Sequence, residues 1–224
     1  MKYKTRRRKP NRRQSLLKQL IFIFLVILGI LVYNKIFNNQ AQKPSEAQLQ
    51  EINEHKFIKE IAPLAQKSQK ESQVLASITI AQACLESNFG KSELARKYHN
   101  LFGVKASGDV PKVSLATQEY ENGQWVTVQG VFRVYPNFAD SVSAHTQLFL
   151  YGTTWNSKQY ASVLSATDYK TAAKAVQNSG YATDPTYADK LINMIETYHL
   201  NQYDKSSSIL KITDRFLSVI FLKF

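Results

Sequence analysis

An uncharged apolar run at residues 20–33, "LIFIFLVILGILVY", is the feature that most limits how this chain can fold. As a helix the run would be apolar on every side, which is typical of a segment surrounded by lipid or by a large protein core. With its flanks, the segment 16–37 has the about 20 residues that a membrane-spanning helix needs. The sequence therefore predicts a transmembrane helix at 16–37 and a separately folded part behind it.

The charges around this run predict its orientation. Residues 1–45 carry 11 Lys and Arg and no acid, whereas the rest of the chain has 18 basic and 17 acidic residues. Basic residues ahead of an apolar run stay in the cytoplasm, so 1–15 is predicted to be a cytoplasmic tail and the folded part to lie outside the cell. Because the positive charge is confined to the tail, a nucleic-acid-binding domain is disfavoured and no nucleic-acid partner is expected.

The segment behind the apolar run favours a retained signal-anchor. It lacks the small A-x-A-like residues of a cleavage site, although cleavage would make the protein secreted. The polar, proline-containing residues 38–47 are predicted to be a linker, 48–203 a folded domain, and 204–224 a tail without an assigned role. Cys84 is the one cysteine, so an internal disulfide is excluded, which suits an exported bacterial protein better than a secreted eukaryotic module.

Hydrophobic periodicity predicts a mainly helical α+β domain with one inserted β-hairpin. Val74, Ile78, Ala81 and Leu85 recur at helical spacing in a helix that ends near Glu86. Asn-Gly at 122–123 predicts a turn between strands at about 112–121 and 124–135. Further helices are expected at 46–68, 140–152, 167–180 and 184–200, the last two with Thr167 and Asp184 as N-caps.

Glu86 stands out because a carboxylate is poorly placed at the negative end of a helix. Helix position, apolar neighbours and partial burial would each raise its pKa. A carboxyl group protonated near neutral pH is what a general acid at a glycosidic oxygen requires. The alternative is a surface glutamate bonded to local backbone.

The sequence lacks the motifs that are typical of other catalytic chemistries. It contains no H-E-x-x-H, no paired cysteines, no G-x-S-x-G and no phosphate-binding loop. Its four histidines are scattered without ligand spacing, and each is expected to be a surface or core residue. No metal and no cofactor are therefore expected.

Three motifs in unbroken order resemble the bacterial glucosaminidase family, glycoside hydrolase family 73, which includes cell-wall autolysins and flagellar wall-cutting domains. The first, "LESNFGKSELA", continues into "NLFGVK"; the second runs from "TQEYENG" to "FRVY"; the third is "GYATDPTY". The similarity spans about residues 50 to 202. It implies a lysozyme-like helical domain with an inserted hairpin and hydrolysis of the β-1,4 bond after N-acetylglucosamine in peptidoglycan.

The resemblance also implies residue roles. Glu86 falls on the catalytic acid, Glu119 on the second acidic position, and Tyr181 on a tyrosine that assists catalysis or substrate placement. Glu121 is the rival of Glu119, and substrate assistance by the acetamido group is the alternative to a second carboxylate. Further candidates for substrate binding are Asn100, Phe102, Tyr135, Glu121 and Tyr187, although core packing is the better expectation for Tyr187.

The sequence thus predicts a membrane-anchored endo-β-N-acetylglucosaminidase that acts on peptidoglycan glycan strands outside a Gram-positive cell. A muramidase or lytic transglycosylase would share the fold and one glutamate but leave different sugar ends. A non-catalytic wall-binding module would keep the cleft and tolerate loss of Glu86. The sequence does not choose among cell separation, glycan trimming and autolysis.

Overall fold

The computed structural model describes most of the chain. The described residues are 12–39, 44–121 and 124–204, with the backbone alone described at 12–18, 36–39, 118–121 and 125. The chain divides into two compact units, Met1–Gln50 and Glu51–Phe224. The predicted tail 204–224 lies outside the described residues except for its first residue.

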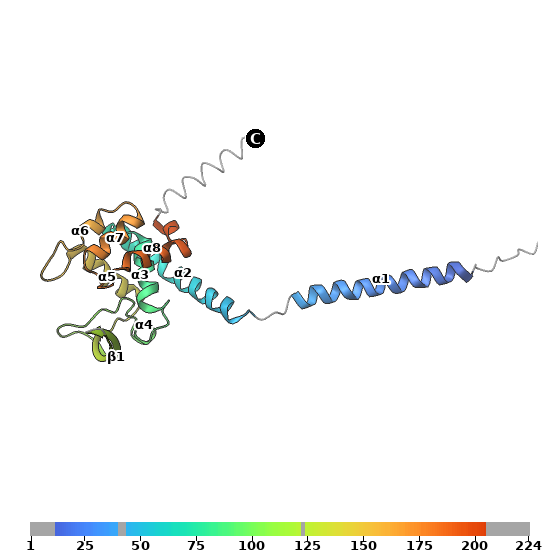
Figure 1. Cartoon of the computed structure of the whole chain (residues 1–224), viewed down its shortest axis with the longest axis horizontal. Coiled ribbons are helices and arrows are strands. Elements are labelled where there is room, and N and C mark those ends of the chain that lie inside the picture. The colour runs from blue at the N-terminus through green and yellow to red at the C-terminus, as the bar shows by residue number, and fades with distance from the viewer. Residues whose placement is uncertain (1–11, 40–43, 122–123, 205–224) are drawn as a thin grey trace, which may run out of the picture. The chain divides into compact units, whose positions relative to one another are not determined.

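The first unit contains helix α1, Arg12–Asn39, which includes the apolar run (Figure 1). The large apolar side chains from Leu20 to Tyr33 are all between 45% and 69% exposed. Within the stretches whose side chains are described, no helix combines the length and apolar character needed to cross a membrane. The predicted transmembrane segment 16–37 stays a prediction.

The second unit is mainly helical, with a helical body and one hairpin (Figure 1). Its helices are α2 Glu46–Ser72, which begins in the first unit, α3 Ala76–Ser87, α4 Glu93–Tyr98, α5 Phe138–Tyr151, α6 Ala161–Leu164, α7 Tyr169–Asn178, α8 Tyr187–Thr197 and the 3-10 helix η1 Leu200–Asp204.

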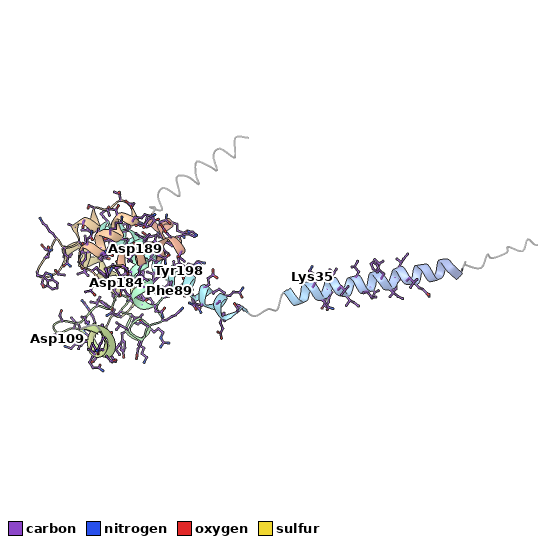
Figure 2. The ribbon with its side chains drawn as sticks, in the orientation of Figure 1. Lys35, Phe89, Asp109, Asp184, Asp189 and Tyr198 are labelled. Atoms are coloured by element: carbon purple, nitrogen blue, oxygen red, sulfur yellow. The ribbon has the colours of Figure 1, made fainter. Side chains whose placement is uncertain are left out.

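Helix α3 lies at the centre of this body. Every residue from Ala76 to Cys84 is buried, and α3 packs against α7, α8 and η1. The predicted stripe is confirmed in its first members, since Val74, Ile78 and Ala81 are at most 1% exposed. At the far end of α3, the rings of Phe89 and Tyr198 lie 5.3 Å apart, and Figure 2 shows the two side by side.

Two predicted helix caps are wrong. Asp168, and not Thr167, caps α7, because its carboxylate accepts the backbone N–H groups of Lys170 and Thr171. Helix α8 begins at Tyr187, later than predicted, and its N-cap residue Thr186 makes no side-chain capping bond. Asp184 instead accepts the backbone N–H of Thr186 and so fixes the turn that precedes the helix.

The hairpin consists of β1, Lys112–Glu121, and β2, Gln124–Arg133, paired antiparallel from Lys112 opposite Arg133 to Glu121 opposite Gln124. This register agrees with a two-residue turn at 122–123, which itself lies outside the described residues. Backbone bonds from Ala106 to Val131 and from Arg133 to Val104 attach β2 to the loop after α4. The hairpin is thereby held to the segment that follows Glu86 in the chain.

Candidate active site

A tight turn ends α3 directly after Glu86. The backbone of Asn88, Phe89 and Gly90 is left-handed, with φ of 50°, 53° and 72°. A Cβ at Gly90 would lie 2.7 Å from the ring of Phe57, so a side chain there would force this ring to move. Ser87 supports the turn by accepting the N–H of Gly90 at 2.7 Å. The E-S-x-x-G pattern therefore holds the carboxyl group of Glu86 at the end of a helix.

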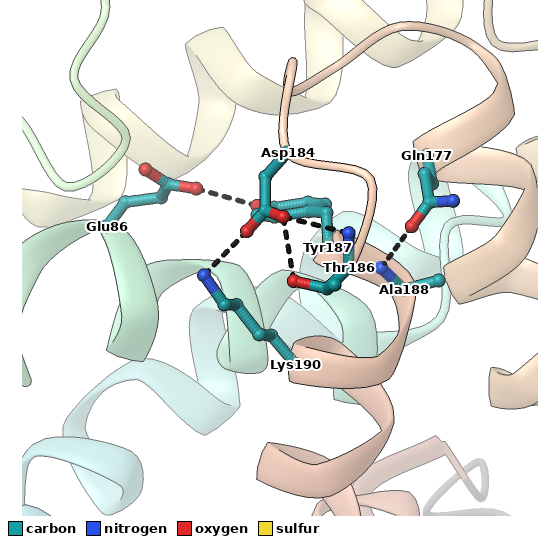
Figure 3. Close-up of polar contacts among 7 residues, drawn as sticks. All are labelled: Glu86, Gln177, Asp184, Thr186, Tyr187, Ala188 and Lys190. Atoms are coloured by element: carbon teal, nitrogen blue, oxygen red, sulfur yellow. Dashed lines mark hydrogen bonds and ion pairs between the residues drawn. The ribbon is translucent and has the colours of Figure 1, made fainter. Parts of the chain in front are cut away.

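The carboxyl group of Glu86 meets α8 at Tyr187. The Tyr187 hydroxyl donates to Glu86 Oε1 at 2.7 Å, and the Tyr187 side chain is otherwise buried (Figure 3). Glu86 itself is exposed on its other side. Tyr187 is thus both a core residue, as its position in the helical stripe predicts, and a direct partner of the candidate acid.

Three influences act on the pKa of Glu86. Burial raises it above its ordinary value, while the hydrogen bond from Tyr187 and the charge of Lys190 lower it again. Protein atoms enclose one side of the carboxyl group while the other stays open to solvent, and the effect of burial outweighs the two influences that lower the pKa. The sequence-based expectation of a raised pKa is therefore matched in direction and in part of its cause.

Lys190 of α8 and Asp184 of the turn that precedes this helix both lie near Glu86 (Figure 3). Its ammonium group contacts Asp184 Oδ2 at 2.5 Å. Hydrogen bonds from Lys190 and Thr186 lower the pKa of Asp184 to about 2, so this carboxylate is charged at neutral pH. Sequence reasoning missed both residues as neighbours of Glu86, although they belong to the third motif and the helix that follows it.

Tyr181 lies in an aromatic cluster next to Tyr187. The two rings stack with centroids 5.8 Å apart, and Phe149 stacks on Tyr181 at the same distance. Burial first, and the charge of Glu86 second, raise the pKa of the Tyr181 hydroxyl well above its ordinary value. Tyr181 is therefore close enough to Glu86 to sense its charge and is neutral at physiological pH.

Glu119 and Glu121 belong to β1, opposite Val126 and Gln124 of β2. The described structure does not include their side chains. It therefore gives no distance from either carboxyl group to that of Glu86. The choice between them as the second acid stays a prediction.

The other predicted substrate-binding residues are buried. Both amide hydrogens of Asn100 donate to backbone carbonyls, of Val104 and Arg133, and its carbonyl accepts the N–H of Val104. Phe102 stacks on His145, and Tyr135 is 4% exposed under the guanidinium of Arg133. This geometry gives Asn100 the task of joining the hairpin to the loop, and it leaves its amide no free hydrogen for a substrate.

Gln82 and His145 are polar residues near the site that sequence reasoning did not select. Gln82 is one helical turn before Glu86 on α3, and it bonds to both Tyr187 and His145. A glutamine at this spacing inside an apolar helix is the signal that could have identified it. Among the described residues, no group of three His, Cys, Asp or Glu could hold a metal ion.

Comparison with known protein families gives a match over the region that contains Glu86, Tyr181 and Tyr187. The glucosaminidase family model, described as mannosyl-glycoprotein endo-beta-N-acetylglucosaminidase, matches residues 62–200. The chain is 43% identical over 208 residues to the exo-glucosaminidase LytG of Bacillus subtilis, covering 92% of this chain and 73% of that protein. It is 39% identical over 155 residues to a "Probable N-acetylmuramidase" of Lactococcus lactis, covering 68% of this chain but only 35% of that protein.

Solved structures agree with the fold. The catalytic domain of the autolysin Auto from Listeria monocytogenes is similar with a TM-score of 0.64 and 34% identity. That match covers 78% of this chain and 97% of the Listeria domain.

Proposed function

Because this chain belongs to the glucosaminidase family of glycoside hydrolases, we propose that it hydrolyses the glycan strands of peptidoglycan at the bond that follows N-acetylglucosamine. The observation that carries the proposal is Glu86, a partly enclosed carboxyl group of raised pKa at the open end of α3. LytG, named an exo-glucosaminidase, supports the sugar specificity.

Glu86 acts as the general acid in this proposal. Its proton passes to the glycosidic oxygen while the bond from that oxygen to the anomeric carbon breaks, so the leaving sugar departs as a neutral alcohol. Tyr187 donates to Oε1 and so stabilises the carboxylate that remains. The proton therefore belongs on Oε2, the oxygen that Tyr187 does not contact.

Glu119 is the proposed second acid. It would activate a water molecule on the opposite face of the sugar, which inverts the anomeric centre if the two carboxyl groups lie about 6.5–9.5 Å apart. Glu121 and the substrate's own acetamido group are the alternatives. Tyr181, within reach of the charge of Glu86, is proposed to help place the sugar.

The names of two relatives differ from the sequence-based prediction, one in where along the strand it cuts and the other in which linkage it cuts. The predicted cleavage is internal, whereas LytG is named an exo-enzyme. The lactococcal relative is named as a muramidase, which would cut the other linkage. We propose glucosaminidase specificity with internal cleavage and treat terminal cleavage as the second candidate, since LytG favours it.

We also propose that the segment 16–37 anchors the enzyme in the cell membrane with the catalytic unit outside. The support is the exposure of every large apolar side chain from Leu20 to Tyr33, together with the basic residues that precede them. Lipid would cover these side chains. With the residues on either side of the apolar run, the segment has the about 20 residues that a membrane-spanning helix needs. Peptidoglycan is then the substrate that this location offers.

Product analysis tests the proposed bond. The full chain is incubated with purified peptidoglycan, the new ends are reduced, and mass spectrometry identifies them. Reduced N-acetylglucosamine is expected; reduced muramic acid would mean a muramidase, and anhydro ends a transglycosylase. Early products of mixed length indicate internal cleavage, whereas single sugars or disaccharides from strand ends indicate exo-cleavage. Wall binding without any cleavage would reject the enzymatic proposal.

A further inference from the structure

A chain of three hydrogen bonds runs from Glu86 into the core, through residues of α3, α8 and α5. Tyr187 donates to Glu86 Oε1 at 2.7 Å, and Gln82 Nε2 donates to the Tyr187 hydroxyl at 3.3 Å. At the other end of the same amide, Gln82 Oε1 lies 3.1 Å from His145 Nε2. We call Glu86, Tyr187, Gln82 and His145 the Glu86 chain.

The donors and acceptors of the Glu86 chain fit together in one direction. Tyr187 has a single hydroxyl hydrogen, so when it donates to the carboxylate its oxygen is left to accept from the Gln82 amide nitrogen. The carbonyl of Gln82 then faces His145, which has to carry its hydrogen on Nε2. Each member thereby fixes the orientation of the next.

His145 is a suitable end for such a chain. It is 1% exposed, and burial lowers its pKa to about 3, so the ring is neutral. Phe102 stacks on it with ring centroids 4.0 Å apart, and Phe149 packs on it at 4.7 Å. In the described part of the chain its Nδ1 has no hydrogen-bond partner. The imidazole is therefore held firmly and directs its one N–H at Gln82.

Core stability alone does not explain these side chains. Gln82 is fully buried in a helix whose neighbours Ile80, Ala81 and Ala83 are apolar, and His145 lies among aromatic rings. Replacing both partners of a buried hydrogen bond by apolar groups of similar shape costs little. What the polar residues add is direction, because they turn the Tyr187 hydroxyl toward Glu86.

We propose that Gln82 and His145 are positioning residues of the hydrolytic reaction, which act on Glu86 only through Tyr187. The inference rests on the proposed function, in which Glu86 is the general acid. With Tyr187 fixed as a donor to Oε1, the acid proton stays on Oε2 and moves from there to the glycosidic oxygen. No proton moves along the Glu86 chain, so its effect is on orientation and on the carboxylate formed as the bond breaks.

A double-mutant cycle tests this proposal with the full chain and soluble glycan strands as substrate. Gln82→Met is expected to lower kcat about tenfold and leave KM within about twofold, because substrate does not touch Gln82. In a Tyr187→Phe background, Gln82→Met should lower kcat no further, since its only route to Glu86 is already gone. Losses that multiply in the double variant, or a Gln82→Met enzyme as active as the parent, would overturn the proposal.

Two substitutions at His145 give an independent test. His145→Phe removes the donor to Gln82, whereas His145→Gln keeps an amide N–H at about the position of Nε2. We expect kcat to fall about tenfold in the first and to recover most of that loss in the second. Equal kcat in the two variants would contradict the proposal, and this pair decides the matter if Gln82→Met does not fold.

Thr146→Val is the matched control. Thr146 follows His145 on α5 and is also buried, and its hydroxyl lies 2.6 Å from that of Ser68. Within the described structure, no hydrogen bond connects Thr146 to Glu86. This variant should lose stability but keep kcat, which separates loss of a buried hydrogen bond from loss of positioning. If Thr146→Val lowers kcat as much as Gln82→Met, the positioning role is rejected. A parent enzyme that fails to cleave would instead reject the proposed function.

Discussion

At the scale of single residues, Glu86 is balanced between burial, which favours its neutral form, and two groups that favour its charged form. Tyr187 donates a hydrogen bond to it, and Lys190 brings a positive charge near it. In the proposed reaction, the same carboxyl group holds a proton before the bond breaks and carries a charge afterwards. An acid of this kind needs both influences, and the structure supplies them from α3 and α8.

Lys190→Met is expected to move the pH dependence of hydrolysis. Loss of the ammonium group removes a charge that lowers the pKa of Glu86, and it leaves Asp184 unpaired nearby, which raises that pKa further. Since Glu86 is proposed to work in its protonated form, the basic limb of the kcat profile should shift to higher pH. The profile is measured beside Lys170→Met, an exposed lysine paired with Glu196. A shift to lower pH, or the same shift in both variants, would contradict this account.

The position of Glu86 at the end of a helix was predictable from the sequence, whereas the side chains that contact it were not. Its position at a helix end and its motif both follow from local order along the chain. Tyr187, Gln82 and His145 come from three helices, so their meeting depends on packing that no local pattern encodes. Asn100, a motif asparagine predicted to bind substrate, has its amide hydrogens bonded to the backbone of Val104 and of Arg133 in β2, and its role in substrate binding stays a prediction.

At the scale of elements, the turn after α3 determines where Glu86 lies. Helix periodicity and the Asn-Gly turn predicted most helices and both strands, because these patterns are set by neighbours a few residues apart. The caps of α7 and α8 were less predictable, since several Thr and Asp residues stand near each helix start and only side-chain geometry chooses among them.

Gly90→Ala should destabilise the catalytic unit, and Gly108→Ala provides a matched comparison. Both glycines have φ of +72°, so each substitution costs about 1–2 kcal/mol for the left-handed backbone. Only at Gly90 does the added Cβ meet a ring, that of Phe57 at 2.7 Å, which adds about 1–3 kcal/mol. Chemical denaturation measures the difference. Equal losses at the two positions would show that Phe57 moves aside without cost.

At the scale of the whole molecule, the chain joins an apolar helix with a basic tail to a near-neutral helical unit. The family predicted from three motifs is confirmed by the match over residues 62–200. Charge and hydropathy change abruptly near residue 45, and the predicted bounds of tail, anchor, linker and domain rest on that change.

Removal of residues 1–45 should separate location from chemistry. We expect the full chain to sediment with lipid vesicles and the shortened chain to stay in the supernatant, because the apolar side chains from Leu20 to Tyr33 are lost. The kcat on soluble glycan strands should be unchanged, since none of the proposed catalytic residues is removed. A full chain that stays in the supernatant would contradict the proposed anchor.

The most direct test of the central claim compares Glu86→Gln with Glu93→Gln in the full chain. Both substitutions remove one carboxylate, but Glu93 is exposed on α4 and pairs only with Lys97 in the described structure. Initial rates on purified peptidoglycan should fall about 10²–10⁴-fold in Glu86→Gln, with wall binding retained, and by less than about twofold in Glu93→Gln. A Glu86→Gln enzyme that keeps the parent rate would contradict the assignment of Glu86 as the general acid.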